Sequence, residues 1–106
     1  MGFEDLIVRS TPKASDRYER ASHVKWRAIE GLIVLIDANE GQLMHLNDMG
    51  SRIWQRLDGE HAVDQILSEL ENAFDATADR LRKDTLKFLR RLSQMELIRK
   101  VDSLTP

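Results

Sequence analysis

The sequence predicts an α+β fold in which a three-stranded antiparallel meander precedes three helices. Two observations indicate it: segment 24–46 alternates short apolar stretches with turns, and segment 47–96 places apolar residues at helical spacing. The chain has 106 residues, which is the size of one domain with one modest core. We therefore expect residues 23–100 to form the domain, with residues 1–22 as a flexible N-terminal arm and residues 101–106 as a tail.

The arm is predicted because a short apolar patch, Leu6 to Val8, precedes the polar stretch STPKASDRYERAS. That stretch contains proline and shows no hydrophobic period. An arm of this kind can cover a strand edge in its own or in a neighbouring molecule. The protein is therefore expected as a monomer or as an arm-swapped dimer.

Three short strands are expected next. VKWRAI alternates apolar and polar side chains, and the apolar run LIVLID begins after a turn at Glu30 and Gly31. The turn ANEG, in which Asn39 and Gly41 tolerate positive φ, leads into the third strand, QLMHL. Side chains on this strand alternate in direction, with Gln42, Met44 and Leu46 toward the core and Leu43 and His45 away from it.

Three helices follow the strands. Asn47 is a good N-cap for the first helix, because its side chain can accept a hydrogen bond from a nearby backbone amide. Thr77 is expected to cap the third helix, which runs from about Ala78 to Glu96. Residues at helical spacing are expected to face the core: Met49, Ile53, Trp54 and Leu57; Val63, Ile66, Leu67, Leu70 and Phe74; Leu81, Thr85, Phe88, Leu92 and Met95. Trp26, on the first strand, is also expected in the core.

The third helix carries more apolar residues than this core face uses. Leu86 lies about 140° from Leu81 around the helix axis, and Leu89 lies about 80° from it. With Arg82 and Ser93 they form a half-apolar flank, and the opposite flank is basic. Two interpretations stay open: exposed side chains on a solvated surface, or a surface that contacts a partner.

The third predicted strand lies at the edge of the meander, where it exposes unpaired backbone groups. QLMHL contains no proline or lysine, so its sequence does little to repel another strand. An open edge beside a half-apolar helix flank can receive an extended peptide by strand addition. Four added backbone hydrogen bonds contribute about 2–6 kcal/mol, which roughly cancels the cost of ordering the peptide, so side-chain pockets must supply most of the affinity.

Composition argues against several classes of function. Without cysteine the chain forms no disulfide, thiolate zinc site or cysteine-ligated iron–sulfur cluster. The three histidines show no metal-ligand spacing, and the five glycines form no phosphate-binding loop. The longest apolar run, Leu32 to Ile36, is far shorter than the roughly 20 residues that cross a bilayer. We expect a cytoplasmic protein that is not an enzyme and uses no cofactor, metal or membrane.

Four stretches of the segment from Gly31 to Ile98 form a combination that is specific in order and spacing. They are a strand ending HLN, the helix GSRIWQRLDG, the opening AVDQIL and the final KDTLKFLRRLSQMELI. Together they resemble the PqqD family, the pyrroloquinoline quinone biosynthesis protein D group and its relatives. The resemblance implies a small winged helix-turn-helix-like domain. It also implies a non-catalytic protein that binds the leader of a ribosomally made, post-translationally modified precursor peptide and presents it to a modifying enzyme, often a radical SAM enzyme with iron–sulfur clusters.

Carried onto this sequence, the resemblance places the leader beside the third strand and against the third helix. Backbone pairing would involve the strand residues Gln42, Leu43, Met44 and His45. Side-chain contacts would come from the helix residues Arg82, Lys83, Leu86, Leu89 and Arg90.

DNA binding is the alternative, because winged helix-turn-helix domains bind DNA and the basic stripe from Arg80 to Arg91 could contact phosphates. The formal net charge of −2 argues against it, as do Asp79 and Asp84 on or near the stripe. The helix also lacks an evident set of base-reading residues at its N-terminal end. We therefore expect no nucleic-acid partner.

Overall fold

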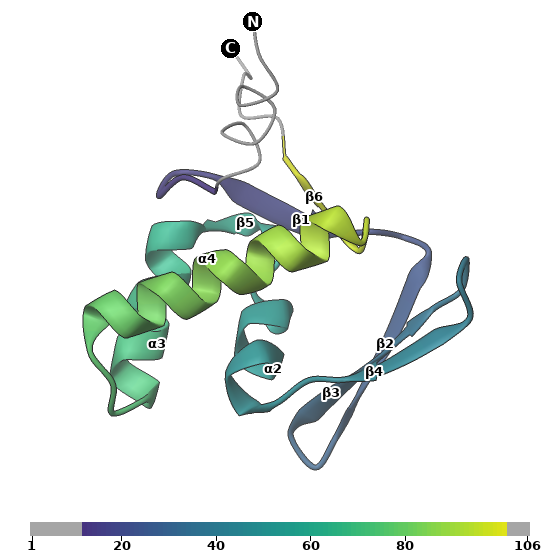
Figure 1. The fold of residues 1–106 in the computed structure, drawn as a ribbon, viewed down its shortest axis with the longest axis horizontal. Helices are drawn as coiled ribbons and strands as arrows, with labels where there is room; N and C mark the ends of the chain where they lie inside the picture. The colour runs from purple at the N-terminus through teal and green to yellow at the C-terminus, as the bar shows by residue number, and fades with distance from the viewer. Residues whose placement is uncertain (1–11, 102–106) are drawn as a thin grey trace, which may run out of the picture.

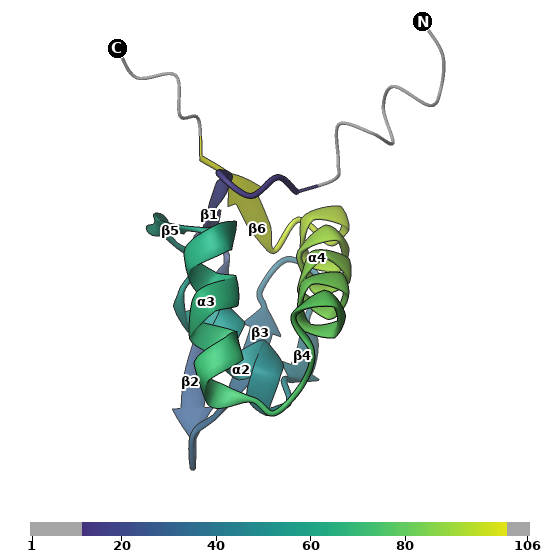
Figure 2. The same ribbon diagram turned by 90° about the vertical axis from the view of Figure 1, so that its left-hand side faces the viewer.

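The computed structural model describes residues 12–101, which form two three-stranded antiparallel sheets and three helices (Figures 1 and 2). One sheet has the order β2-β3-β4 and comprises β2 (Val24–Ile29), β3 (Leu32–Asp37) and β4 (Gln42–His45). The other has the order β5-β1-β6 and comprises β1 (Arg17–Arg20), β5 (Asp58–Ala62) and β6 (Ile98–Lys100). The helices are α2 (Asp48–Gln55), α3 (Val63–Ala73) and α4 (Ala78–Gln94). The predicted α+β fold, a meander followed by three helices, is confirmed.

The β2-β3-β4 meander is held by two turns at the predicted positions. Between β2 and β3 the backbone adopts positive φ at Glu30 (54°) and Gly31 (85°), and glycine takes this conformation without steric cost. Between β3 and β4 the buried Asp37 carboxylate accepts hydrogen bonds from the backbone N–H groups of Asn39 (2.9 Å) and Glu40 (3.3 Å). The second turn is therefore closed by a side chain as well as by the backbone.

Helix α2 packs against the inner face of this sheet and fixes the position of β4. The hydroxyl of Ser51, which is buried, accepts a hydrogen bond from the Ile33 N–H at 2.8 Å. The same hydroxyl lies 3.4 Å from the Leu46 carbonyl oxygen, just beyond the end of β4. A single side chain thus joins α2 to both β3 and the chain leaving β4.

The helices begin where capping residues were predicted. The Asn47 side chain accepts from the Gly50 N–H at 2.8 Å, and the Thr77 hydroxyl accepts from the Arg80 N–H at 3.2 Å. These bonds satisfy backbone donors that have no partner within the helix. Within residues 12–101, no helix is both long and apolar enough to cross a membrane.

The second sheet, β5-β1-β6, was not predicted from the sequence. Arg17–Arg20 forms its central strand, so the prediction of a flexible arm is wrong for this part of residues 1–22. Strand β1 pairs with segments distant in sequence, as in the register Tyr18↔Lys100, and such pairing leaves no local signal. The predicted apolar patch Leu6 to Val8 lies outside the described residues.

Tyr18 offers a test of how firmly β1 is docked. It is the chain's one tyrosine, and its burial, together with the nearby charge of Asp16, raises its pKa to about 12. A tyrosine in an unfolded chain ionises near pH ~10, so this contribution to stability is complete below that pH and is lost as the pH rises toward 12. We expect ultraviolet absorbance to show phenol ionisation near pH 12. If the Tyr18 phenol ionised at about pH 10 while the circular dichroism spectrum stayed unchanged, the result would contradict the packing of β1 against the domain.

Helix α4 is rotated relative to the predicted orientation. Its buried residues are Leu81, Thr85, Leu89 and Leu92, and their mean direction lies about 35° from Leu81 toward Leu89. Leu89 has no exposed surface, so its predicted place on a surface flank is wrong. Phe88 and Met95, expected in the core, are only partly buried and lie at one margin of the core face.

The two tryptophans have different environments. Trp54 has no exposed surface, which confirms its predicted place in the core. Trp26 is 41% exposed, so the corresponding prediction for it is wrong. The reason is that Trp26 lies on β2, an edge strand of its sheet, whereas α2 packs on the central strand, β3. The Arg20 guanidinium, 5.1 Å from the Trp26 ring centroid, covers part of the ring instead.

Candidate functional site

Strand β4 has an open side. The Leu46 N–H donates to the Ile33 carbonyl oxygen at 2.9 Å, and inward and outward bonding alternate along an antiparallel strand. Met44 therefore also bonds toward β3, whereas the N–H and C=O groups of Leu43 and His45 point to the open side. Within residues 12–101 no strand pairs with that side. The protein thus presents four backbone groups in the geometry that an added strand requires.

The side chains of β4 alternate as predicted from Leu43 onward, whereas Gln42, expected toward the core, is exposed. Met44 is partly buried and packs against the core, as does Leu46 after the strand. Leu43 is 58% exposed and His45 is exposed, and both lie on the outer face of the sheet. A strand added beside β4 would therefore alternate between the core side, toward α2 and α4, and the outer face.

A hollow of about 340 Å³ lies between the start of α2 and one flank of α4. Phe88 forms an apolar wall, and its ring lies close to Gly50: a Cβ atom on Gly50 would lie 3.4 Å from Phe88 Cζ, about van der Waals contact. The hollow begins at Asn47, two residues after β4 ends, although none of its lining residues belongs to β4. Its lining residues are Asn47, Met49, Gly50 and Ile53 from the α2 side and Asp84, Lys87, Phe88 and Arg91 from α4.

The rim of this hollow is cationic. The Asp84 carboxylate accepts a hydrogen bond from Arg80 Nε at 3.0 Å, so its charge is largely balanced. Lys87 and Arg91 are exposed, and neither has an ion-pair partner among the described residues. The hollow therefore suits an apolar side chain flanked by a carboxylate.

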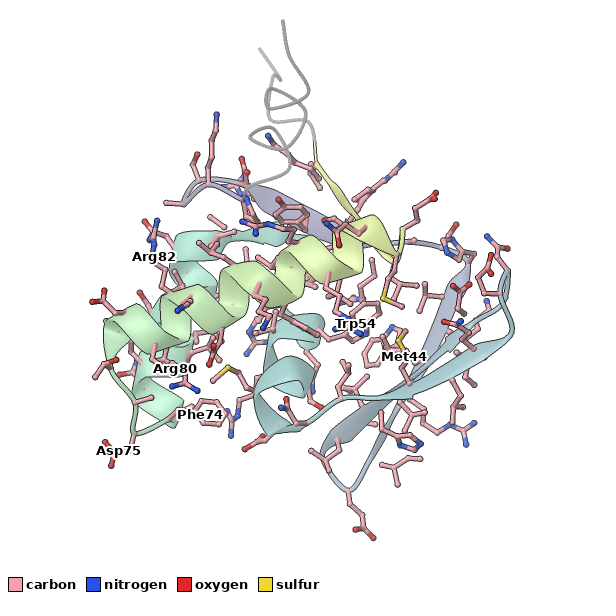
Figure 3. All side chains as sticks on the ribbon, viewed as in Figure 1. Met44, Trp54, Phe74, Asp75, Arg80 and Arg82 are labelled. Carbon is pink, nitrogen blue, oxygen red and sulfur yellow. The ribbon has the colours of Figure 1, made fainter. Side chains whose placement is uncertain are left out.

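The structure separates the predicted helix contacts from this hollow, because none of them lines it. Leu86 is partly buried against the core and lies about 160° around the axis from Phe88. Figure 3 shows Arg82 on the upper side of α4, whereas Met44 lies below the helix. Lys83 and Arg90 are exposed on the solvent side, and Leu89 is buried.

Sequence reasoning missed the α4 side of the hollow, namely Asp84, Lys87, Phe88 and Arg91. Phe88 had been assigned to the core and the two cations to an unused basic flank. The missing information was the rotation of α4: with the core direction moved about 35° toward Leu89, Phe88 becomes a margin residue next to Lys87 and Arg91. The sequence would have identified this flank only if it had shown which leucines of α4 are buried.

A larger hollow of about 600 Å³ lies between the β2–β3 turn, α2 and α3. Four of its five charged side chains pair with one another, Arg56 with Glu69 at 2.7 Å and Arg52 with Asp48 at 3.4 Å, and the fifth, Glu30, lies in the turn after the edge strand β2. We therefore place the functional site at β4 rather than at the larger hollow. Among residues 12–101, no group of three or more His, Cys, Asp or Glu side chains is arranged to hold a metal ion.

Comparison with known proteins identifies the family of the chain. A protein-family model described as "Coenzyme PQQ synthesis protein D (PqqD)" matches residues 33–98, more than half of the chain. The chain belongs to the PqqD family. The resemblance seen in the sequence from Gly31 to Ile98 is thereby confirmed, and curated protein sequences give no significant match.

Two solved structures share the fold of this PqqD-family chain. One is TbiB1 in complex with the TbiA(beta) leader peptide, with a TM-score of 0.70 and 23% identity over 83% of this chain and 99% of the other. The second is lasso peptide synthetase B1 complexed with the leader peptide, with a TM-score of 0.70 and 18% identity over 78% and 98% of the two chains. At this level of identity the likeness establishes the fold.

Proposed function

We propose that this PqqD-family protein is a non-catalytic chaperone that captures the leader of a ribosomally synthesised precursor peptide. The leader adds as a strand to the open side of β4, and the protein presents it to a modifying enzyme of the radical SAM class. The observation that carries the proposal is the outward-facing backbone of Leu43 and His45 beside the hollow on α4. Family membership and the leader peptides bound to both structural neighbours support it.

The free energies indicate how much of the binding affinity the strand and the hollow each contribute. Four backbone hydrogen bonds at Leu43 and His45 contribute about 2–6 kcal/mol, against an ordering cost of about 2–5 kcal/mol or more. Micromolar affinity requires about 8 kcal/mol. One apolar side chain buried against Phe88 adds about 1.5–3 kcal/mol, and a carboxylate paired with the exposed Lys87 or Arg91 adds up to about 1 kcal/mol. The leader is therefore an extended segment with an apolar anchor and a neighbouring acidic residue.

Hydrogen exchange tests the proposal at single residues. The probe is a synthetic leader peptide, taken from a short precursor to be sought in the reading frames that neighbour the gene of this protein. We expect the amides of Leu43 and His45 to exchange rapidly in the free protein and slowly in the complex, because the peptide supplies their acceptors. The amides of Met44 and Leu46 serve as internal controls, since they bond to β3 in both states.

Three results would contradict the proposal. Binding without slower exchange at Leu43 and His45 would place the leader elsewhere. Modification of the precursor by this protein alone would show that it is an enzyme. A gel shift with mixed duplex DNA that weakens steeply with salt would support DNA binding instead.

A further inference from the structure

Strand β3 is apolar on both faces, although the described residues cover only one of them. On the inner face, Ile33 and Leu35 have no exposed surface. On the outer face, Leu32 is 44% and Ile36 is 46% exposed. Strands that are apolar on both faces are typical of sheets with both faces covered. The composition of β3 therefore indicates that a further surface packs on the outer face.

The exposed apolar side chains on the outer face form one continuous patch across the three strands. The register sets Ile29 opposite Leu32 and Ile36 opposite Leu43, and directly opposed residues share a face. Ile29 is 53% and Leu43 is 58% exposed. Isolated exposed leucines are ordinary, but contiguous apolar patches mark interaction sites. We call this surface the outer patch: Ile29, Leu32, Val34, Ile36 and Leu43.

The charges around the outer patch have one sign. Lys25 stands opposite Ile36 and Arg27 stands opposite Val34, while no strand position on this face carries a carboxylate. Neither cation has an ion-pair partner within residues 12–101. A second copy of the chain would bring the same cations and no strand carboxylate, which disfavours self-association through this face. The complementary surface is apolar with carboxylates at its edge.

We propose that the outer patch docks the modifying enzyme through a surface of apolar side chains edged by Asp or Glu. This inference rests on the proposed function, because it names the partner that receives the leader. Strand β4 belongs to both surfaces: its open side offers backbone groups to the peptide, and its outer face offers Leu43 to the enzyme. An enzyme on the outer patch therefore lies next to the bound leader without competing for its hydrogen bonds.

Two variants test the patch against a purified radical SAM enzyme, to be sought in the reading frames that neighbour the gene of this protein. Ile36→Glu places a charge in the apolar centre, and its half-exposed position tolerates the change. We expect enzyme affinity to fall at least about tenfold while leader affinity changes less than about twofold. The double variant Lys25→Glu with Arg27→Glu should also weaken enzyme binding, and more strongly at low salt. Because this variant leaves the apolar residues unchanged, it provides a second test should Ile36→Glu fail to fold.

A matched control makes the same change of charge at the β5-β1-β6 sheet, with Arg17→Glu in β1 and Lys13→Glu in the segment just before it, and should leave enzyme affinity unchanged. Enzyme affinity unaffected by both patch variants would overturn the inference while leaving leader binding intact. Failure of leader binding in the wild-type protein would instead overturn the proposed function. Sedimentation showing a wild-type dimer that Ile36→Glu dissociates would assign the patch to a second copy. Binding to anionic phospholipid vesicles that is lost in Ile36→Glu would assign it to a membrane.

Discussion

Replacing His45 by proline will weaken leader binding at least about tenfold and leave the fold intact. The His45 N–H points to the open side of β4, where it is available to an incoming strand and makes no bond to β3. Proline removes this donor, and its ring occupies the space in which the peptide carbonyl must lie. The loss of this hydrogen bond costs about 0.5–1.5 kcal/mol of binding free energy, and the proline ring also displaces the neighbouring hydrogen bond. Together the two losses reach about 1.4 kcal/mol or more, which corresponds to a tenfold loss of affinity.

The fold should tolerate this change, because proline occurs on edge strands where the N–H faces solvent. The residue before it, Met44, is already in the extended conformation that proline requires of its neighbour. The matched control is His45→Ala, which removes the same side chain and keeps the backbone donor. Calorimetry should give this control nearly the wild-type affinity. Equal affinity in the proline and alanine variants would show that the leader does not pair with β4.

Replacing Phe88 by glutamate is expected to have a comparable effect, for a different reason. Phe88 forms the apolar wall of the hollow on α4, so the substitution removes an anchor contact of about 1.5–3 kcal/mol. The new carboxylate also lies beside the place where an acidic residue of the leader would meet Lys87 or Arg91. We expect a loss of affinity of at least about tenfold. Urea unfolding measures the accompanying loss of stability, since Phe88 also packs against the core.

The same substitution at Leu86 decides between the two flanks of α4. The family resemblance assigns Leu86 to the peptide, whereas the hollow lies about 160° away around the helix. Geometry therefore predicts that Leu86→Glu lowers stability, because Leu86 packs against the core, and changes leader affinity less than Phe88→Glu does. A larger loss of affinity for Leu86→Glu would place the leader on the flank that the sequence indicated.

Elements with local signals were predictable from the sequence. The turns at Gly31 and Gly41 and the caps at Asn47 and Thr77 lie where they were expected, because each depends on a few neighbouring residues. The β5-β1-β6 sheet was not predictable in this way. Its strands join positions such as Glu19 and Arg99, which are 80 residues apart in the chain. No short window of sequence contains both partners.

The open edge at β4 was predictable from the sequence, whereas the hollow on α4 was not. The edge position of β4 followed from the order of the strands, and the unguarded sequence QLMHL identified the open side. On α4 the apolar arc runs about 160° from Phe88 through Leu81 to Leu86, wider than the core needs. Because apolar residues of this helix face both the core and the hollow, the sequence pattern alone does not show which direction faces the core. The rotation of the helix is decided by packing against the other elements.

The pairing of β1 with β6 also settles where a covalent partner can be attached. The Val101 N–H donates to the Arg17 carbonyl oxygen at 2.8 Å, so the first and last strands meet at one sheet. In Figure 1 that sheet and β4 lie at different ends of the molecule. A domain attached before β1 or after β6 would therefore emerge from that sheet and not from the open side of β4. The arrangement of the strands is thus compatible with genetic fusion to the proposed enzyme partner, and with attachment to a sensor surface from the β1 or β6 side.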